Sequence, residues 1–413
     1  MSLTKTIPSV AEVRTRPNAV GAPAPDYNIS IGYLRAFLTV LVVAHHAALA
    51  YATFAPPVAP SLVAPVRWWQ AFPIVDLHKW GGADTLVGFN DTFFMSLMFF
   101  ISGLFVWRSL QRKGIGDFLH NRTLRLGIPF LGAAAIIAPL AYYPTYLQTG
   151  HHGISGFAHQ WLSLGYWPAG PAWFVWLLLA FDCAAAALCF YKPGWVEAVG
   201  CFLARLANKP IRFLGYLIGL SAAVYIPMAV RFNPLAWTQF GPLAFQTSRI
   251  LPYLVYFLMG IAVGAYGIEH GILASTGKLA RRWLLWSGAA LVVFLASSAF
   301  FIMIVTSAKA TSVSWQAAAD LVFTITCATT TLAILALFVR FVKKSRRVFN
   351  SLRDNAYGIY LVHYAFVSWL QYALLKSQLS GFAKLTIVLS LAIVLSWITT
   401  AALRRIPACA RIL

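Results

Sequence analysis

The sequence predicts an all-α protein, a polytopic membrane helix bundle of about ten transmembrane helices with both termini in the cytoplasm. Hydrophobic residues make up 60% of the 413 positions and charged residues only 10%, which leaves too little polar surface for a soluble globular chain. Apolar runs of roughly 18 to 25 residues recur along the chain, and each is long enough to cross about 30 Å of hydrocarbon as a helix. The alternation of a membrane β-strand does not occur in these runs.

The order of the elements follows from these runs. The predicted spans are 31–53, 90–110, 124–147, 171–191, 212–230, 249–268, 284–306, 317–339, 355–376 and 383–403. Lys and Arg concentrate in the tail and in alternate loops, so the positive-inside rule places these segments and both termini in the cytoplasm. A flexible cytoplasmic tail (1–29) is therefore expected to precede the membrane domain (30–405), and a short cytoplasmic tail (406–413) to follow it.

The net charge of +21 is explained by this topology. The basic residues are spread over many short loops, whereas a nucleic-acid-binding protein gathers them on one domain. Membrane lipids are thus the expected partners, and nucleic acid is not. The five cysteines show no metal-ligand spacing, so we expect no metal site. The oligomeric state stays open.

Two long loops are predicted on the outer side of the membrane. The first, 54–89, is rich in Pro and carries Trp68, Trp69 and Trp80; the second is 148–170. Loops of this length are commonly functional. Their aromatic side chains suit stacking on sugar faces, or they anchor the loops at the membrane interface.

The first span contains three basic side chains, Arg35, His45 and His46. A basic residue near the bilayer centre costs about 2.5–3.5 kcal/mol, so such groups normally face a protein interior or a water-filled cavity. Arg35 and His46 are eleven positions apart, which places them only about 20° apart around a helix and about 16 Å apart along it. One cavity could therefore contact both. His46 would then act as a general base, and Arg35 would bind phosphate or carbonyl oxygens. The alternatives are a snorkelling Arg35 and structurally hydrogen-bonded histidines.

Further polar residues occupy or border other spans. Arg122 and Arg125 lie at i and i+3 before Pro129, where they could bind a phosphate or serve as positive-inside anchors. Asp182, in the fourth span, could orient a base, neutralise an arginine or make a structural contact.

The ninth span carries a stripe of tyrosines. Tyr357, Tyr360 and Tyr364 follow at i, i+3 and i+7, and His363 is one position from the stripe. Such a stripe serves packing or lines a cavity.

Taken together, these residues resemble the acyltransferase-3 family of membrane O-acyltransferases over nearly the whole chain from about Tyr27. The resemblance rests on an Arg-x10-His element, a Phe-Phe-x-x-Ser-Gly element, an Arg-x-x-Arg-x-x-x-Pro element, a Tyr-x-Ile-Tyr-Leu-x-His element and a Trp-Phe pair. The matching residues are Arg35 and His46, Met98–Gly103 with Ser102 and with Met98 in place of the first Phe, Arg122, Arg125 and Pro129, Tyr357–His363, and Trp173 and Phe174. Ser96 stands where many members have Asp, which is more similar to the periplasmic-glucan succinyltransferase branch.

The resemblance implies a multi-pass enzyme of the bacterial inner membrane that moves an acetyl or succinyl group from cytoplasmic acyl-CoA to a hydroxyl of an extracytoplasmic carbohydrate. It implies His46, Arg35 and His45 as catalytic residues and Arg122, Arg125 and Arg35 as donor-binding residues. Acetyl-CoA or succinyl-CoA would be a substrate, with no permanently bound cofactor. The remaining pocket residues are expected to be Ser102, Asp182, Trp173, Tyr360 and His363.

Two other classes of protein remain open on the sequence. A transporter or flippase would use Arg35, His46 and Asp182 to bind an anionic or glycan substrate and to relay protons. A membrane scaffold or sensor would need none of these residues individually.

Overall fold

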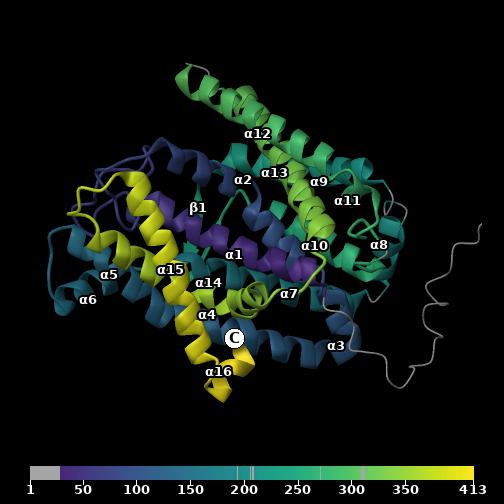
Figure 1. Cartoon of the computed structure of the whole chain (residues 1–413), viewed down its shortest axis with the longest axis horizontal. Helices are drawn as coiled ribbons and strands as arrows, with labels where there is room; N and C mark the ends of the chain where they lie inside the picture. Colours follow the sequence, from purple (N-terminus) through teal and green to yellow (C-terminus); the bar gives the residue numbers. More distant parts are fainter. Residues whose placement is uncertain (1–27, 193, 205, 207–208, 270, 308–311) are drawn as a thin grey trace, which may run out of the picture.

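The computed structural model describes residues 28–413 except 193, 205, 207–208, 270 and 308–311 (Figure 1). The first half of this part contains α1 (Ile29–Leu49), η2 (Trp68–Gln70), α2 (Gly81–Gly103), α3 (Val106–Arg122), η3 (Thr123–Gly127), α4 (Ile128–Gly132), η4 (Ala133–Ile137), α5 (Ala138–Gln148), α6 (Ile154–Leu162), η5 (Gly170–Ala172), α7 (Trp173–Tyr191) and α8 (Trp195–Ala204). The second half contains α9 (Pro210–Phe232), β1 (Trp237–Phe240), β2 (Leu243–Gln246), α10 (Ile250–Tyr266), α11 (Lys278–Arg281), α12 (Trp283–Thr306), α13 (Val313–Phe341), α14 (Arg347–Ala373), α15 (Gly381–Leu403) and α16 (Pro407–Ile412).

The fold is an all-α polytopic bundle, as predicted. Eight helical segments of the described chain are long and apolar enough to cross a membrane, and α10 is a shorter apolar helix of 17 residues. Helix α14 is long but begins with a polar stretch. A short antiparallel hairpin, in which β1 pairs with β2, is the only strand pairing in the described part, and the sequence did not predict it.

Helix α1 lies in the middle of the bundle, while α12 projects from it at the top of the view (Figure 1). Burial follows this arrangement. In the most apolar 18-residue stretch of each helix, 61% of α1 is buried inside the protein, against 11% of α12. The exposed side chains of α12 are large and apolar, for example Leu284, Val292 and Phe301, which suits contact with lipid. The centre of the bundle is therefore where polar side chains can be held away from hydrocarbon.

Helices α2 and α10 approach each other closely through glycines. A Cβ atom at Gly103 would lie 2.2 Å from the carbonyl oxygen of Phe257, and one at Gly260 would lie 2.1 Å from that of Phe100. Small residues at a helix contact allow backbones to approach in membranes, where the hydrophobic effect between helices is absent. Gly103, which closes the Ser-Gly element, is thus required by packing.

The second predicted span has different bounds in the structure. The sequence placed it at 90–110, but α2 begins at Gly81 and ends at Gly103, and α3 follows after a break. The early turns of α2 are polar, yet their side chains have partners: Asp84 accepts from the backbone N–H of Thr53 at 2.7 Å, and Asn90 donates to the carbonyl of Leu41 at 3.2 Å. The polar first turns shifted the predicted beginning of this span, because sequence hydropathy does not show which polar groups have partners in the protein.

Helices α1 and α14 run in the same direction side by side. At their beginnings the Tyr33 hydroxyl lies 2.7 Å from Asn350 Oδ1, and near their ends Gln371 Nε2 donates to the carbonyls of His46 and Ala47 at 3.0 and 3.1 Å. These contacts fix the register between the two helices. That register determines which side chains of α1 meet α14.

Candidate active site

Three histidines gather where α1 meets α14. The ring of His46 lies 5.3 Å from that of His363 and 4.9 Å from that of Tyr364, measured between centroids. His45 is turned toward α2 instead, where its ring stacks on Phe94 at 5.3 Å. Successive helical positions are 100° apart, so the two adjacent histidines of α1 have different neighbours.

The ring nitrogens of this cluster are only partly used by the protein. His363 is fully buried, and its Nδ1 lies 2.7 Å from the carbonyl oxygen of Tyr360. That contact requires Nδ1 to carry the proton, which leaves Nε2 as a hydrogen-bond acceptor. Within the described residues, His363 Nε2 and His46 Nδ1 have no hydrogen-bond partner. Buried polar atoms are normally paired, so these nitrogens are suited to a bound substrate.

The three tyrosines of the predicted stripe on α14 position the helix and do not offer free hydroxyls. Each donates to a backbone carbonyl on another element: Tyr357 to Arg125 at 2.7 Å, Tyr360 to Pro171, and Tyr364 to Gln70 at 3.2 Å. Tyr360 was expected among the pocket residues, and its ring does lie beside His363 at 6.0 Å. The stripe fixes the face of α14 that carries His363.

Two of the carbonyls that α14 binds lack the usual helical donor four residues later, because that residue is proline. Pro129 has no N–H and cannot bond the carbonyl of Arg125 four residues earlier, and Pro144 likewise cannot bond that of Leu140. Tyr357 donates to the first, and Trp369 Nε1 donates to the second at 3.0 Å. The proline of the Arg-x-x-Arg-x-x-x-Pro element and the first tyrosine of the α14 element are therefore complementary parts of one helix contact.

Arg35 lies on the same unbroken helix as His46. Because α1 is continuous over Ile29–Leu49, the eleven-residue spacing keeps the two side chains about 20° apart around the axis. The Arg35 side chain is exposed, whereas His46 is half-buried, with its Nδ1 atom fully buried. Arg35 thus lies toward the beginning of the helix, on the same face as His46.

The predicted phosphate-binding arginines have different environments. Arg122 ends α3, and its Nε lies 3.1 Å from Oδ2 of the fully buried Asp182 on α7. Arg125 is exposed in the π-helical turn η3. A π turn holds more residues than an α turn, so the i, i+3 spacing no longer places both side chains on one narrow face. Of the roles considered for Asp182, pairing with an arginine is the one its geometry fits.

Ser102 and Trp173 make contacts away from the histidines. The Ser102 hydroxyl donates to the carbonyl of Met98 on its own helix at 2.8 Å. The Trp173 ring lies 5.9 Å from that of Tyr253 and 5.5 Å from that of Trp237 in the hairpin. The contacts of the described residues do not bring either side chain to His46.

An ion pair between Asp91 of α2 and the buried Arg249 at the start of α10 was not predicted. Arg249 Nη1 and Nη2 bind the carboxylate of Asp91 at 2.9 and 2.6 Å, and the guanidinium lies 4.7 Å from the ring centroid of Phe323. Asp91 is one turn from Phe94, the residue on which His45 stacks. An Asp and an Arg within predicted spans were the available signal, because such residues in membranes usually pair with one another.

A second unpredicted cluster links the loop after α1 to α15. Lys384 is fully buried, and its Nζ lies 2.7 Å from Asp76 Oδ2 and 3.2 Å from His78 Nδ1. Lys384 is a single lysine near the start of an apolar predicted span, and such a residue normally needs a partner. The sequence could not identify this partner, which lies 308 positions away.

The fold and this cluster define a class of protein: a multi-pass helical membrane protein with partly unpaired histidines inside its bundle. Residues 28–401 match the family model Acyl_transf_3, described as an acyltransferase domain. The chain therefore belongs to the acyltransferase-3 family and is a membrane acyltransferase. No curated protein and no solved structure matches the chain.

Proposed function

We propose that this protein transfers an acetyl or succinyl group from cytoplasmic acyl-CoA to a hydroxyl of an extracytoplasmic carbohydrate, in the bacterial inner membrane. The observation that supports this proposal is the pair of adjacent imidazoles, His46 and His363, at the α1–α14 contact. Both the Arg-x10-His element and the α14 element of the family supply a residue to it. Proton transfer from a hydroxyl near neutral pH is a reaction for which imidazole is well suited.

In this proposal His46 is the general base. The acceptor hydroxyl loses its proton to a ring nitrogen of His46 as its oxygen bonds to the thioester carbonyl carbon. The carbon–sulfur bond then breaks, and the CoA thiolate takes the proton from the His46 imidazolium, which regenerates the base. His363 holds its own tautomer through Tyr360 and supports the imidazolium of His46 from a neighbouring ring, while the adjacent Tyr364 packs edge-on against the same imidazole.

The donor is proposed to enter from the cytoplasmic end of the bundle. Arg122 and Arg125 would bind CoA phosphates, and Arg35 would guide the thioester arm along the face of α1 that ends at His46. Arginine is suited to such contacts because its planar guanidinium binds phosphate and carbonyl oxygens through several N–H groups. The ion pair with Asp182 keeps the guanidinium of Arg122 beside α7.

The central test replaces the proposed base. We expect His46→Ala to lower acylation of the acceptor by roughly 10² to 10⁴, the usual contribution of a general base. The measurement is acyl transfer by purified protein in proteoliposomes, and mass spectrometry of the glycan product identifies the acyl group from its mass. His159→Ala is the matched control, because His159 is exposed on α6.

Near wild-type acylation by a folded His46→Ala protein would exclude His46 as the base. The same proteoliposomes distinguish the other class considered for this chain. Accumulation of an unchanged solute, without consumption of acyl-CoA, would indicate a transporter instead of an enzyme.

A further inference from the structure

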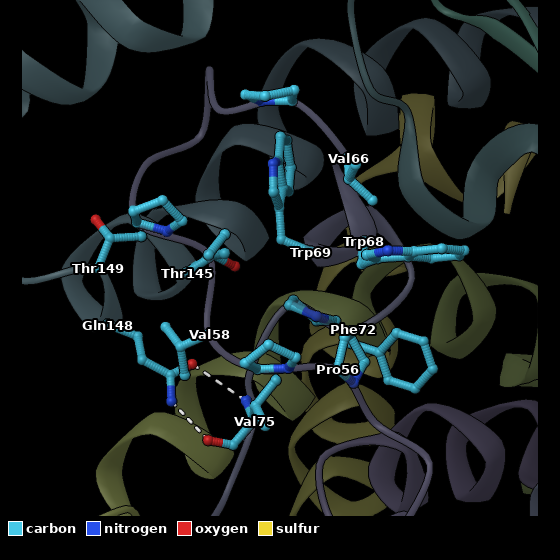
Figure 2. Close-up of a pocket in the computed structure, with 15 residues that line it drawn as sticks. Pro56, Val58, Val66, Trp68, Trp69, Phe72, Val75, Thr145, Gln148 and Thr149 are labelled. Atoms are coloured by element: carbon cyan, nitrogen blue, oxygen red, sulfur yellow. Dashed lines mark hydrogen bonds between the residues drawn. The ribbon is translucent and has the colours of Figure 1, made fainter.

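The loop between α1 and α2 folds over the end of α5 and encloses a pocket of about 210 Å³ (Figure 2). Prolines from 56 to 73 form much of its wall, together with Trp68, Trp69 and Phe72. Gln148 of α5 fastens the loop, since its side chain accepts from the N–H of Val75 at 3.1 Å and donates to the carbonyl of Val75 at 2.7 Å. We call this cavity the loop pocket.

We propose that the loop pocket binds one neutral sugar residue of the acceptor glycan, next to the residue that is acylated. This inference rests on the proposed function, because it takes the acceptor to be a carbohydrate. It adds a second binding site to the reaction, outside the histidine cluster.

A buried hydroxyl in the wall supports a polar ligand. Thr145 is 3% exposed, and its Oγ1 has no hydrogen-bond partner within the described residues. Figure 2 shows this side chain on the pocket wall, with its oxygen on the side that faces Trp69. A threonine hydroxyl both donates and accepts, which is what a sugar hydroxyl requires of a partner. A lipid chain would leave it unsatisfied.

The rest of the lining suits a sugar ring. Trp68 lines the pocket and keeps 53% of its total surface exposed, although it is a large aromatic residue. The lining contains no charged side chain, so an anionic headgroup would find no counter-charge. The volume is below the about 300–1,000 Å³ of sites that enclose drug-sized ligands, which favours a single ring over an oligosaccharide.

The pocket is separated from the histidines by one layer of side chains. Gln70 lies between Trp69 and Phe72 in the loop, and its carbonyl accepts hydrogen bonds from Tyr142 at 2.9 Å and Tyr364 at 3.2 Å. The ring of Tyr364 in turn lies 4.9 Å from that of His46. The loop pocket is therefore connected to the proposed base through Gln70 and Tyr364, and a glycan held in the pocket by one residue would extend from there toward the base.

The test measures glycan binding without catalysis. Full-length protein in nanodiscs is titrated with neutral oligosaccharides of glucose, galactose and mannose, and binding is followed by saturation-transfer NMR. We expect at least one of them to bind, to bind about tenfold more weakly to Trp68→Ala, and to bind about three- to tenfold more weakly to Thr145→Val, which loses one hydrogen bond. Trp68→Phe and Thr145→Ser should retain most of the affinity, because they keep the aromatic face and the hydroxyl.

Phe240→Ala is the matched control, since Phe240 is an aromatic residue of the hairpin with 80% exposure and does not line the pocket. Equal affinity of Trp68→Ala and wild type, or the absence of binding by every oligosaccharide, would overturn the inference. So would a Trp68→Ala protein that is altered only in its association with lipid, because Trp68 would then be an interfacial anchor.

Failure of the proposed function gives a different result. If the wild type binds glycan through Trp68 and Thr145 but never acylates it, the pocket stands and the acyl transfer is refuted. If Trp68→Ala acylates glycan with unchanged KM and kcat, the acyl transfer stands and the pocket is refuted.

Discussion

The Arg122–Asp182 pair shows how one residue can serve both stability and binding. Asp182 is fully buried on α7, and the Nε of Arg122 is 3.1 Å away. Removing one partner of a buried pair leaves an uncompensated charge, which costs more than the pair itself contributes. A single substitution at Arg122 therefore cannot separate a structural role from donor binding.

A double-mutant cycle separates the two roles. We expect Arg122→Gln to destabilise the protein by about 3 kcal/mol, and the double variant Arg122→Gln with Asp182→Asn to recover most of this loss, because the charge at 182 is then absent. The KM for acyl-CoA should stay raised in the double variant if Arg122 binds phosphate. Thermal unfolding in detergent and acyl-CoA kinetics are the measurements.

Arg125 provides the control for this cycle. It is exposed, so Arg125→Gln should raise the KM for acyl-CoA while leaving the Tm near that of the wild type. A double variant with recovered stability and a wild-type KM would restrict Arg122 to its structural pairing.

At the scale of whole elements, α14 holds the site together. It carries His363, it is in register with α1 through Tyr33 and Gln371, and its Tyr357 binds the carbonyl that Pro129 leaves free. The proline-induced irregularity of η3 and α4 is thus compensated by another helix, as is usual for proline in membrane helices.

This compensation can be tested with Tyr357 and Pro129. Tyr357→Phe should destabilise the protein by about 1 kcal/mol, because the carbonyl of Arg125 loses its donor. In a Pro129→Ala background the same substitution should cost less, since the introduced alanine can supply the helical N–H that proline lacks. Thermal unfolding of the two single variants and the double variant measures the coupling.

Equal costs of Tyr357→Phe in the two backgrounds would mean that the hydroxyl does not compensate for the proline. Tyr216→Phe is a suitable control, because Tyr216 is an exposed residue of α9.

At the scale of the whole molecule, the predicted topology places the loop pocket and the donor arginines on opposite sides of the membrane. The loop that follows α1 would be outside, and Arg122, two helices later, would be inside. A transfer between compartments needs this separation, with the histidines in between.

Cysteine accessibility tests that topology. In a chain without other cysteines, Cys409 should react with a membrane-impermeant maleimide only after permeabilisation, because it lies in α16 at the predicted cytoplasmic end. A cysteine introduced by Ser163→Cys, in the exposed segment after α6, should react in intact cells. Labelling of Cys409 in intact cells would invert the predicted orientation.

Much of the bundle was predictable from sequence because hydropathy reports directly on contact with lipid. The prediction of helical spans was confirmed where helices are apolar, as in α12 and α15. It was wrong at the start of α2, where Asp84, Asn90 and Asp91 have partners in the protein. It also missed the β1–β2 hairpin, because these two short strands are stabilised by pairing with each other and carry no hydropathy pattern that marks them in the sequence.

For the site, the spacing of Arg35 and His46 determined that they share a face, because helical periodicity is local. Which residues meet His46 was decided by packing, since His363 is 317 positions away in the chain. The partners of Asp182 and Lys384 were decided in the same way.

By itself, the sequence determined that the chain is helical and suited to lipid, and that certain polar groups within its spans require hydrogen-bond or charge partners. Only the tertiary structure decided which of those groups are satisfied by one another and which keep an unpaired nitrogen. The physical reason is that burial of a polar group has a local cost, set by residue type and hydropathy, whereas its compensation depends on contacts between distant segments.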